Sequence, residues 1–240
     1  MANAWARDRA RDFYMVFALM AVAAVGIGFS TTYFIPGPRG GLNIPWIVHV
    51  HGWLAMAWVL LLVAQVWLVR SGQSRLHRRV GQAALPLAFA IWASGIATGI
   101  WATRRDLPQM GYAAYANTSG TAISLTVFLL LVISAVAMRR RPDWHKRLVL
   151  LATVVVLWPA FFRFRHILPE MPRPDIFLSL LLADTPILIA AIRDKLRFGR
   201  VHSAWRWVGT GVFVEQILES LAFETGLNRA PGAWLYGLLT

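Results

Sequence analysis

Residues 46–69 read WIVHVHGWLAMAWVLLLVAQVWLV and contain no Asp, Glu, Lys or Arg. A helix of this length can cross the hydrocarbon core of a bilayer, which needs about 20 apolar residues. Soluble domains carry roughly 25% charged residues, whereas this 240-residue chain has 15% charged and 58% hydrophobic residues. The composition therefore excludes an ordinary soluble domain and predicts an integral membrane protein.

Six further stretches have a similar apolar character. The complete set of predicted spans is Phe13–Phe34, Trp46–Val69, Gly81–Ala102, Asn117–Met138, Arg147–Phe164, Ile176–Ile192 and Ala204–Phe223. No segment between them is long enough to form a soluble domain, so residues 1–240 are expected to form one unit. We predict an all-α integral membrane bundle of seven transmembrane helices.

The basic residues divide unequally between the two sides of this predicted bundle. Of the 24 Lys and Arg residues, 17 fall on the side of the N-terminus and 7 on the other side. Because positively charged loops stay in the cytoplasm, we predict a cytoplasmic N-terminus and a periplasmic C-terminus in a bacterial inner membrane. The net charge of +13 then faces anionic lipid headgroups, and no nucleic-acid partner is expected.

Ionisable side chains inside the predicted spans are candidates for function, because a charge at the helix centre costs about 2.5–3.5 kcal/mol. Counted along the helices at about 1.5 Å per residue, five such groups fall in the outer half of the bilayer. They are His49, His51, Asp184, Glu215 and Glu219. Imidazoles and carboxylates together are the ligands of zinc, manganese and non-haem iron sites.

We interpret this set as a metal site whose ligands are His49, His51 and Glu219. Glu215 or Asp184 would complete the ligand shell or act as a general base, and Arg163 would pair with a carboxylate. Zinc would imply hydrolysis through an activated water, and iron would imply redox chemistry. The alternative is a satisfied buried network in which protonated carboxyl groups are hydrogen-bonded or paired with Arg163.

A b-type haem is a second use of the same region. It would take one axial imidazole from His49 or His51 and the other from His166, with Arg163 or Arg165 near the propionates. The chain contains no cysteine, which excludes disulfides, thiolate metal sites, iron–sulfur clusters and thioether-attached haem.

A second candidate site lies at the predicted cytoplasmic face. Three odd-numbered spans are preceded by similar sequences that contain His77, His145 and His202 with nearby cations. Together with Asp194 these histidines could hold a lipid headgroup, a quinone or a metal. The alternative is that His, Arg and Trp are all favoured at membrane interfaces.

Several short motifs resemble a family of uncharacterised bacterial multi-pass membrane proteins with seven helices. They are His49-Val50-His51-Gly52-Trp53, Gln65, Leu76-His77-Arg78-Arg79-Val80-Gly81, Arg139-Arg140-Arg141-Pro142, His145-Lys146-Arg147-Leu148, Arg163, Asp194, Gly199-Arg200-Val201-His202 and Gly28-Phe29-Ser30-Thr31-Thr32-Tyr33. More distantly, the chain is similar to transmembrane b-type cytochromes. The resemblance implies a seven-helix membrane protein and assigns no reaction.

Three functions are consistent with these patterns. The first is a metal-dependent or haem-dependent redox or hydrolytic enzyme that acts on a lipophilic substrate or a quinone. The second is a proton-coupled transporter in which Asp184, Glu215 and Glu219 carry protons in a bundle bent at Pro186. The third is a structural or assembly subunit of a larger membrane complex.

Overall fold

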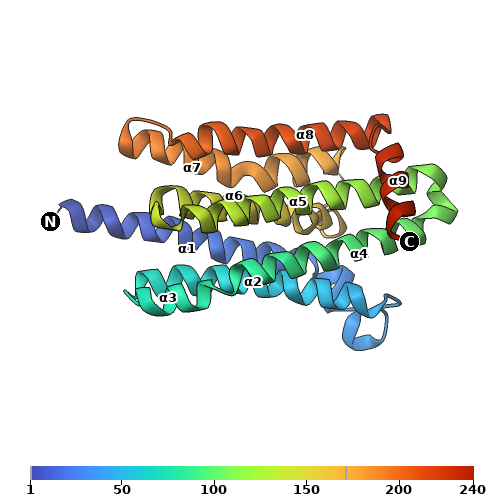
Figure 1. Cartoon of the computed structure of the whole chain (residues 1–240), viewed down its shortest axis with the longest axis horizontal. Helices are drawn as coiled ribbons and strands as arrows, with labels where there is room; N and C mark the ends of the chain where they lie inside the picture. The colour runs from blue at the N-terminus through green and yellow to red at the C-terminus, as the bar shows by residue number, and fades with distance from the viewer. Residues whose placement is uncertain (1, 171) are drawn as a thin grey trace.

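A computed structural model describes residues 2–170 and 172–240, with side chains described from Asp12 onward. Regular structure in these residues is helical throughout (Figure 1). The helices are α1 (Ala2–Gly28), η1 (Ser30–Phe34), η2 (Gly37–Arg39), α2 (Trp46–Arg70), α3 (Ser74–Gly81), α4 (Ala84–Met110), η3 (Gly111–Tyr115), α5 (Ala116–Ala137), η4 (Met138–Arg140), α6 (Pro142–Phe162), η5 (Arg163–His166), η6 (Asp175–Leu182), α7 (Ala183–Phe198), η7 (Ala204–Gly209), α8 (Thr210–Thr225) and α9 (Arg229–Leu239).

The chain is a helical transmembrane protein. Four helical segments of the described residues are long and apolar enough to cross a membrane, namely Trp46–Arg70, Ser74–Arg140, Pro142–His166 and Asp175–Phe198. A bent pair, Asp12–Gly28 with Ser30–Arg39, forms a fifth segment if its 47° break lies within one span.

The segment Ser74–Arg140 folds back on itself, because α4 and α5 within it lie side by side (Figure 1). The rod formed by η7 and α8 is not among the qualifying segments, and it carries Arg206, Glu215 and Glu219. An all-α fold with four or five candidate membrane spans is thus confirmed, whereas the number of seven spans and the orientation of the two termini stay predictions.

Helix α6 lies at the centre of the bundle. It packs against α1, α5, η6 and α7, and residues 150–155 along it are all buried. A helix that is apolar around its whole circumference is suited to such an enclosed position. The other long helices have one face toward α6 or its neighbours and another face that is exposed.

The exposed faces of the bundle are apolar. Trp53 and Leu60 of α2 are 62% and 51% exposed, and Leu188 of α7 and Leu218 of α8 are 61% and 60% exposed. Large apolar side chains spread over several helices in this way suit contact with lipid tails rather than with water.

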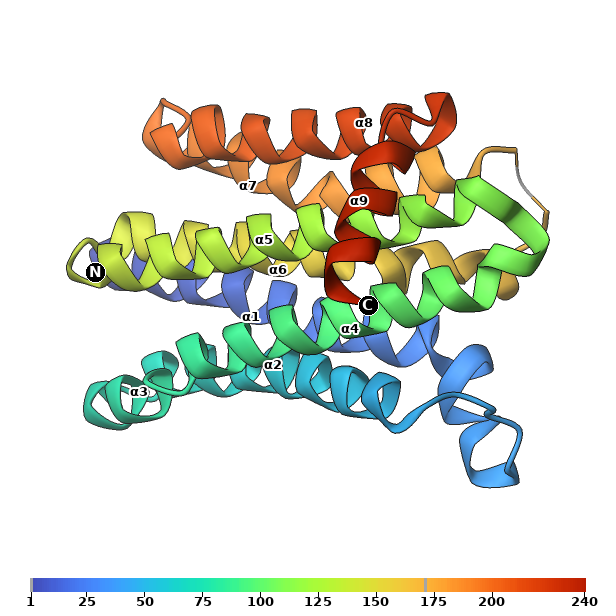
Figure 2. The ribbon, with the colours of Figure 1, turned by 45° about the vertical axis from the view of Figure 1, so that its right-hand side comes forward.

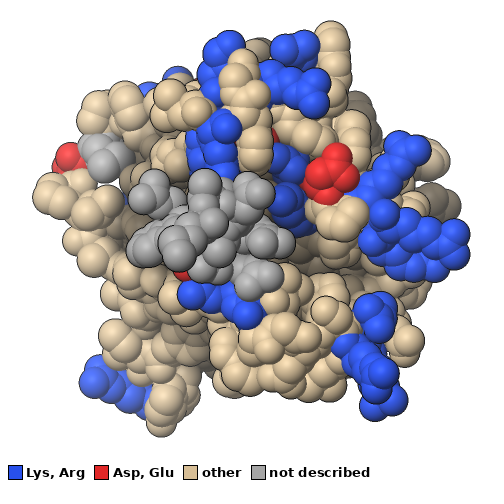
Figure 3. All heavy atoms as spheres, turned by 90° about the vertical axis from the view of Figure 1, so that its left-hand side faces the viewer, with Lys and Arg blue, Asp and Glu red and all other residues tan. Residues whose placement is uncertain are grey.

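The two ends of the bundle differ in charge. The N-terminus, α3 and the turns after α5 and α7 lie at one end, which we call the N-terminal end, and α9 and the C-terminus lie toward the other (Figures 1 and 2). Lys and Arg side chains surround much of the N-terminal end, and few Asp or Glu side chains are visible there (Figure 3).

Helices α1 and α6 approach each other closely at Gly28. A Cβ atom at this position would overlap the backbone carbonyl of Ala160, whereas a Cβ atom at Gly26 would have no neighbour within 4 Å. Glycine at position 28 therefore sets the distance between the outer parts of these two helices.

This contact gives a matched pair of variants. Gly28→Ala should lower the free energy of unfolding by about 1–3 kcal/mol, because the added methyl group forces two backbones apart. Gly26→Ala should leave stability unchanged or raise it by about 0.5–1 kcal/mol, because alanine favours a helix more than glycine does. Thermal unfolding in detergent would measure both, and equal midpoints for the two variants would contradict the close contact.

Candidate functional site

The two histidines of α2 face different neighbours. His49 Nδ1 lies 2.7 Å from the hydroxyl of Tyr33 in η1. His51 Nδ1 lies 3.1 Å from Oγ of Ser94 in α4. Because α2 is a regular α-helix from Trp46, residues two apart point in nearly opposite directions, and the expected convergence of the two imidazoles does not occur.

The proton of His51 can be assigned from its partner. Ser94 Oγ already donates to the backbone carbonyl of Ala90 at 2.6 Å, so it accepts from His51 Nδ1–H. His51 also packs closely on α4, since a Cβ atom at Gly95 would lie 2.8 Å from its Cε1 atom. These contacts give His51 a helix-packing role.

The three carboxyl groups gather where α5, α7 and α8 meet. Ser124 Oγ of α5 donates to Glu219 Oε2 of α8 at 2.7 Å. Gln216 Nε2 of α8 donates to Asp184 Oδ1 of α7 at 3.1 Å. Glu215 lies beside Gln216 and one turn before Glu219, so α8 contributes polar groups toward both neighbouring helices. We call Asp184, Glu215, Gln216, Glu219 and Ser124 the carboxyl cluster.

Several polar atoms of the carboxyl cluster have no hydrogen-bond partner. They are both carboxyl oxygens of Glu215, Oδ2 of Asp184 and Oε1 of Gln216, and all four are buried. Leaving a buried polar group unpaired costs about 1–3 kcal/mol. Four such atoms at one place in a membrane bundle make the carboxyl cluster a candidate functional site.

The predicted outer-face cations lie apart from these carboxyl groups. Arg163 Nη1 donates to the carbonyl of Pro159 at 2.8 Å, and its guanidinium lies over the ring of Phe29. Arg165 donates to the carbonyl of Phe162 at 3.1 Å. His166 is exposed at the end of η5.

The predicted metal ligands are thus divided among three places, with His49 at η1, His51 at α4 and Glu219 at α5. Among the side chains that the structure describes, those of residues 12–170 and 172–240, no group of three or more His, Cys, Asp or Glu could hold a metal ion. The metal and haem cofactors stay predictions. The carboxyl cluster is the stronger candidate for a functional site.

At the N-terminal end, two of the predicted histidines lie near each other. The rings of His77 in α3 and His145 in α6 are 6.5 Å apart. His145 Nδ1 lies 2.8 Å from the backbone carbonyl of Ala135. The side-chain amide of Gln65 donates from its nitrogen to His77 Nδ1. Its oxygen accepts from the backbone N–H of Gly81 at 2.8 Å. These contacts fasten the short helix α3 to α2 and leave the two imidazoles side by side.

Asp194 and His202, the other predicted members of this site, have separate partners. Arg147 donates to Asp194 Oδ2 from Nη2 at 2.5 Å and from Nε at 3.1 Å, and Trp205 Nε1 donates to the same oxygen at 3.0 Å. His202 Nδ1 accepts from the backbone N–H of Ala204, so its Nε2–H donates to Asp143 at 3.1 Å. The four residues therefore form a His77–His145 pair, a buried Arg147–Asp194 ion pair and a His202–Asp143 hydrogen bond rather than one ring.

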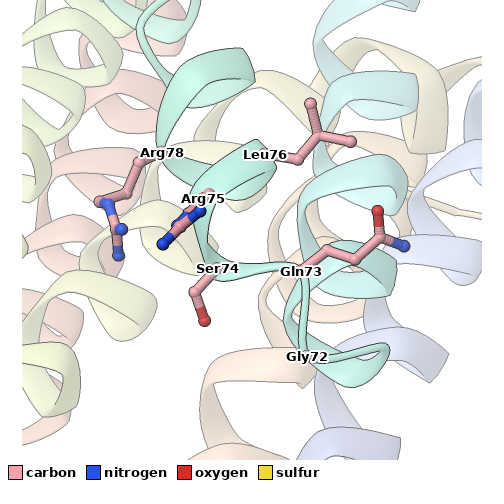
Figure 4. A pocket seen from close by; sticks show the side chains of 6 residues that line it. All are labelled: Gly72, Gln73, Ser74, Arg75, Leu76 and Arg78. Carbon is pink, nitrogen blue, oxygen red and sulfur yellow. The ribbon is translucent and has the colours of Figure 1, made fainter.

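A pocket of about 530 Å³ opens at the turn between α2 and α3 (Figure 4). Its lining residues are Gly72, Gln73, Ser74, Arg75, Leu76 and Arg78. Arg75 and Arg78 extend to one side of the helix, and Gln73 and Leu76 extend to the other (Figure 4). The two guanidinium groups suit the predicted contact with anionic headgroups, and this partner stays a prediction.

Two residues of the carboxyl cluster were missed by sequence reasoning. Gln216 follows Glu215 within an apolar run, and a polar residue at such a position is itself a signal. Ser124 lies in a span without charged residues, where it is one of several Ser and Thr residues and nothing in the sequence singles it out. Its partner is a residue 95 positions away in the chain, so only the folded arrangement connects them.

The Arg147–Asp194 pair gives a test of stability at the N-terminal end. Its side chains are 4% and 2% exposed, so Asp194→Asn should lower the free energy of unfolding by about 3–5 kcal/mol, because it leaves a buried guanidinium without a counter-ion. Asp12→Asn is the control: it breaks an exposed pair with Arg70 and should cost no more than about 1 kcal/mol. Unfolding of both variants in detergent would check this, and similar losses would contradict the buried pairing.

Comparisons of the chain with protein-family models, with curated proteins and with solved structures give no match. The resemblance to a family of bacterial membrane proteins therefore stays a prediction.

Proposed function

We propose that the protein is a proton-coupled membrane transporter whose protons are carried by Asp184, Glu215 and Glu219. The observation that carries the proposal is Glu215, whose two carboxyl oxygens are buried and have no hydrogen-bond partner. Ionisable groups inside membrane helices mark substrate pathways and proton relays. A carboxyl group that is not tied to a fixed cation is free to exchange a proton.

The neighbours of Glu215 support proton transfer along α8. Glu219 lies one turn away on the same helix face, and Ser124 connects it to α5 at 2.7 Å. On the other side, Gln216 connects α8 to Asp184 of α7 at 3.1 Å. Two neutral polar side chains, Ser124 and Gln216, thus contact the carboxyl groups. Because both are neutral, neither would retain a proton that passes between the carboxyl groups.

An apolar layer separates the carboxyl cluster from the Arg147–Asp194 network. Asp184 and Asp194 are about 15 Å apart along α7, and Pro186, Ile187 and Ala190 are the buried residues between them. Ile187 also packs near Gly209 of η7, since a Cβ atom there would lie 3.1 Å from it. Such a barrier on one side of a buried site is what alternating access requires.

The helix that carries Asp184 changes its geometry beside the cluster. Residues 175–182 form the π-helix η6, α7 begins at Ala183, and Pro186 follows two residues after Asp184. Wide π-helical turns within helices occur frequently at functional sites. Proline within a helix also removes a backbone hydrogen bond, so the helix lacks one donor close to the proposed proton carrier.

Proton flux into proteoliposomes would test this function. Glu215→Gln should lower the flux driven by a pH gradient by about tenfold or more, because the amide cannot exchange a proton. Glu224→Gln is the matched control, since Glu224 lies on the same helix but is exposed and paired with Arg173. Wild-type flux in the Glu215→Gln variant, with normal unfolding behaviour, would overturn the proposal.

The proposal has the N-terminal end in the cytoplasm of a bacterial cell, in line with its basic surface (Figure 3). Because the chain lacks cysteine, single cysteines can report this orientation. A membrane-impermeant maleimide should label Gln109→Cys in intact spheroplasts, because Gln109 is exposed near the end of α4 that lies away from the N-terminal end. It should label Gln73→Cys, in the turn between α2 and α3, only after permeabilisation. The opposite pattern would reverse the orientation.

A further inference from the structure

A groove beside the carboxyl cluster lies between α5 and the η7–α8 rod. It has a volume of about 280 Å³ and is lined by Val127, Leu130, Leu131, Ser134, Val208, Gly211, Val212 and Glu215. Seven of these eight residues carry no ionisable group, and Glu215 is the exception. The two carboxyl oxygens of Glu215 are themselves buried, so a ligand in the groove pairs with them only after this side chain turns toward it. Gly211 leaves open space along the groove, since a Cβ atom there would have no neighbour within 4 Å.

The walls and the acid of this groove together define the ligand that suits it. Apolar walls favour a hydrocarbon body, because its transfer into the groove buries apolar surface. An ionised carboxylate without a partner favours a cation, and the low dielectric of the groove strengthens that attraction. A neutral ligand would leave Glu215 unpaired, and an anion would be repelled.

The groove can be reached from the lipid phase. Leu130 of α5, one of its lining residues, is 56% exposed on the outer surface of the bundle. The groove extends from Glu215, near the middle of the rod 204–225, toward Val208 and Ser134 and so toward the N-terminal end. A membrane-soluble ligand could thus enter sideways between α5 and α8.

We propose that this groove binds lipophilic organic cations, and that each cation displaces the proton of Glu215. The proposal rests on the proposed function, because Glu215 is also its proton carrier, and it names the substrate class. The exchange is balanced: the protonated carboxyl group releases one H⁺ as one monovalent cation pairs with the carboxylate. No net charge then accumulates in the groove.

Tetraphenylphosphonium is a suitable probe, since it is a rigid lipophilic cation that cannot itself donate a proton. Calorimetry with the purified full chain in nanodiscs would measure its binding, and a pH indicator in weak buffer would measure proton release. At a pH low enough that Glu215 is protonated before binding, we expect saturable binding with one proton released per cation bound. Tetraphenylborate, an anion of the same shape, should not compete.

Two variants test the charge of Glu215 and the volume of the groove separately. Glu215→Gln should weaken tetraphenylphosphonium binding by about tenfold or more and abolish proton release, because the charged partner is lost. Gly211→Leu should weaken binding by filling the groove while leaving Glu215 able to exchange protons. Glu224→Gln should behave as the wild type, and thermal unfolding would confirm that each variant is folded.

The outcomes distinguish the two proposals. Binding that is unchanged in both Glu215→Gln and Gly211→Leu, or binding without proton release, would overturn the cation site. Absence of binding in the wild type would overturn it as well, and Glu215-dependent proton flux in proteoliposomes would then leave the proposed transporter function standing. Loss of both signals in the wild type would remove both proposals.

Discussion

The enclosure of α6 is the constraint on which the arrangement of the other helices depends. Neither water nor lipid can reach most of this helix, so each polar group on it needs a partner within the protein. Arg147 meets Asp194 and Trp205, and Thr153 accepts from Trp58 Nε1 at 3.2 Å while donating to the carbonyl of Val149. These pairings hold α7, η7 and α2 around α6.

Buried polar groups on α6 have partners, whereas several in the α7–α8 region do not. This difference distinguishes polar groups with a structural role from those with a proposed functional role. On α6 the buried arginine and threonine are satisfied, and their removal would expose unpaired groups in an apolar core. Around Glu215 the unpaired oxygens are present in the native fold itself. A protein tolerates that cost where a ligand or a proton completes the site, which is why the carboxyl cluster rather than the ion pair carries the proposed chemistry.

The apolar runs predicted most of the helices, because length and composition alone select membrane-crossing segments. They did not predict the π-helical turns at η1, η6 and η7 or the terminal helix α9, since these depend on packing. Depth estimates place Asp184 and Glu215 at a similar level, and in the structure Asp184 contacts Gln216, the neighbour of Glu215 on α8. Depth along a helix does not show in which direction a side chain points around the helix axis. The sequence therefore predicts His49 and His51 at one metal site, although a regular helix turns them toward different neighbours.

Glu215 lies near the middle of the rod formed by η7 and α8, and this position has an electrical consequence. A charge that crosses the whole membrane potential gains about 2.3 kcal/mol per 100 mV. In the proposed transporter, a proton that reaches Glu215 from one aqueous side crosses roughly half of that field, which corresponds to about 1 kcal/mol per 100 mV. The occupancy of this carboxyl group would then be coupled to voltage as well as to acidity, and an energised membrane would bias which side supplies its proton.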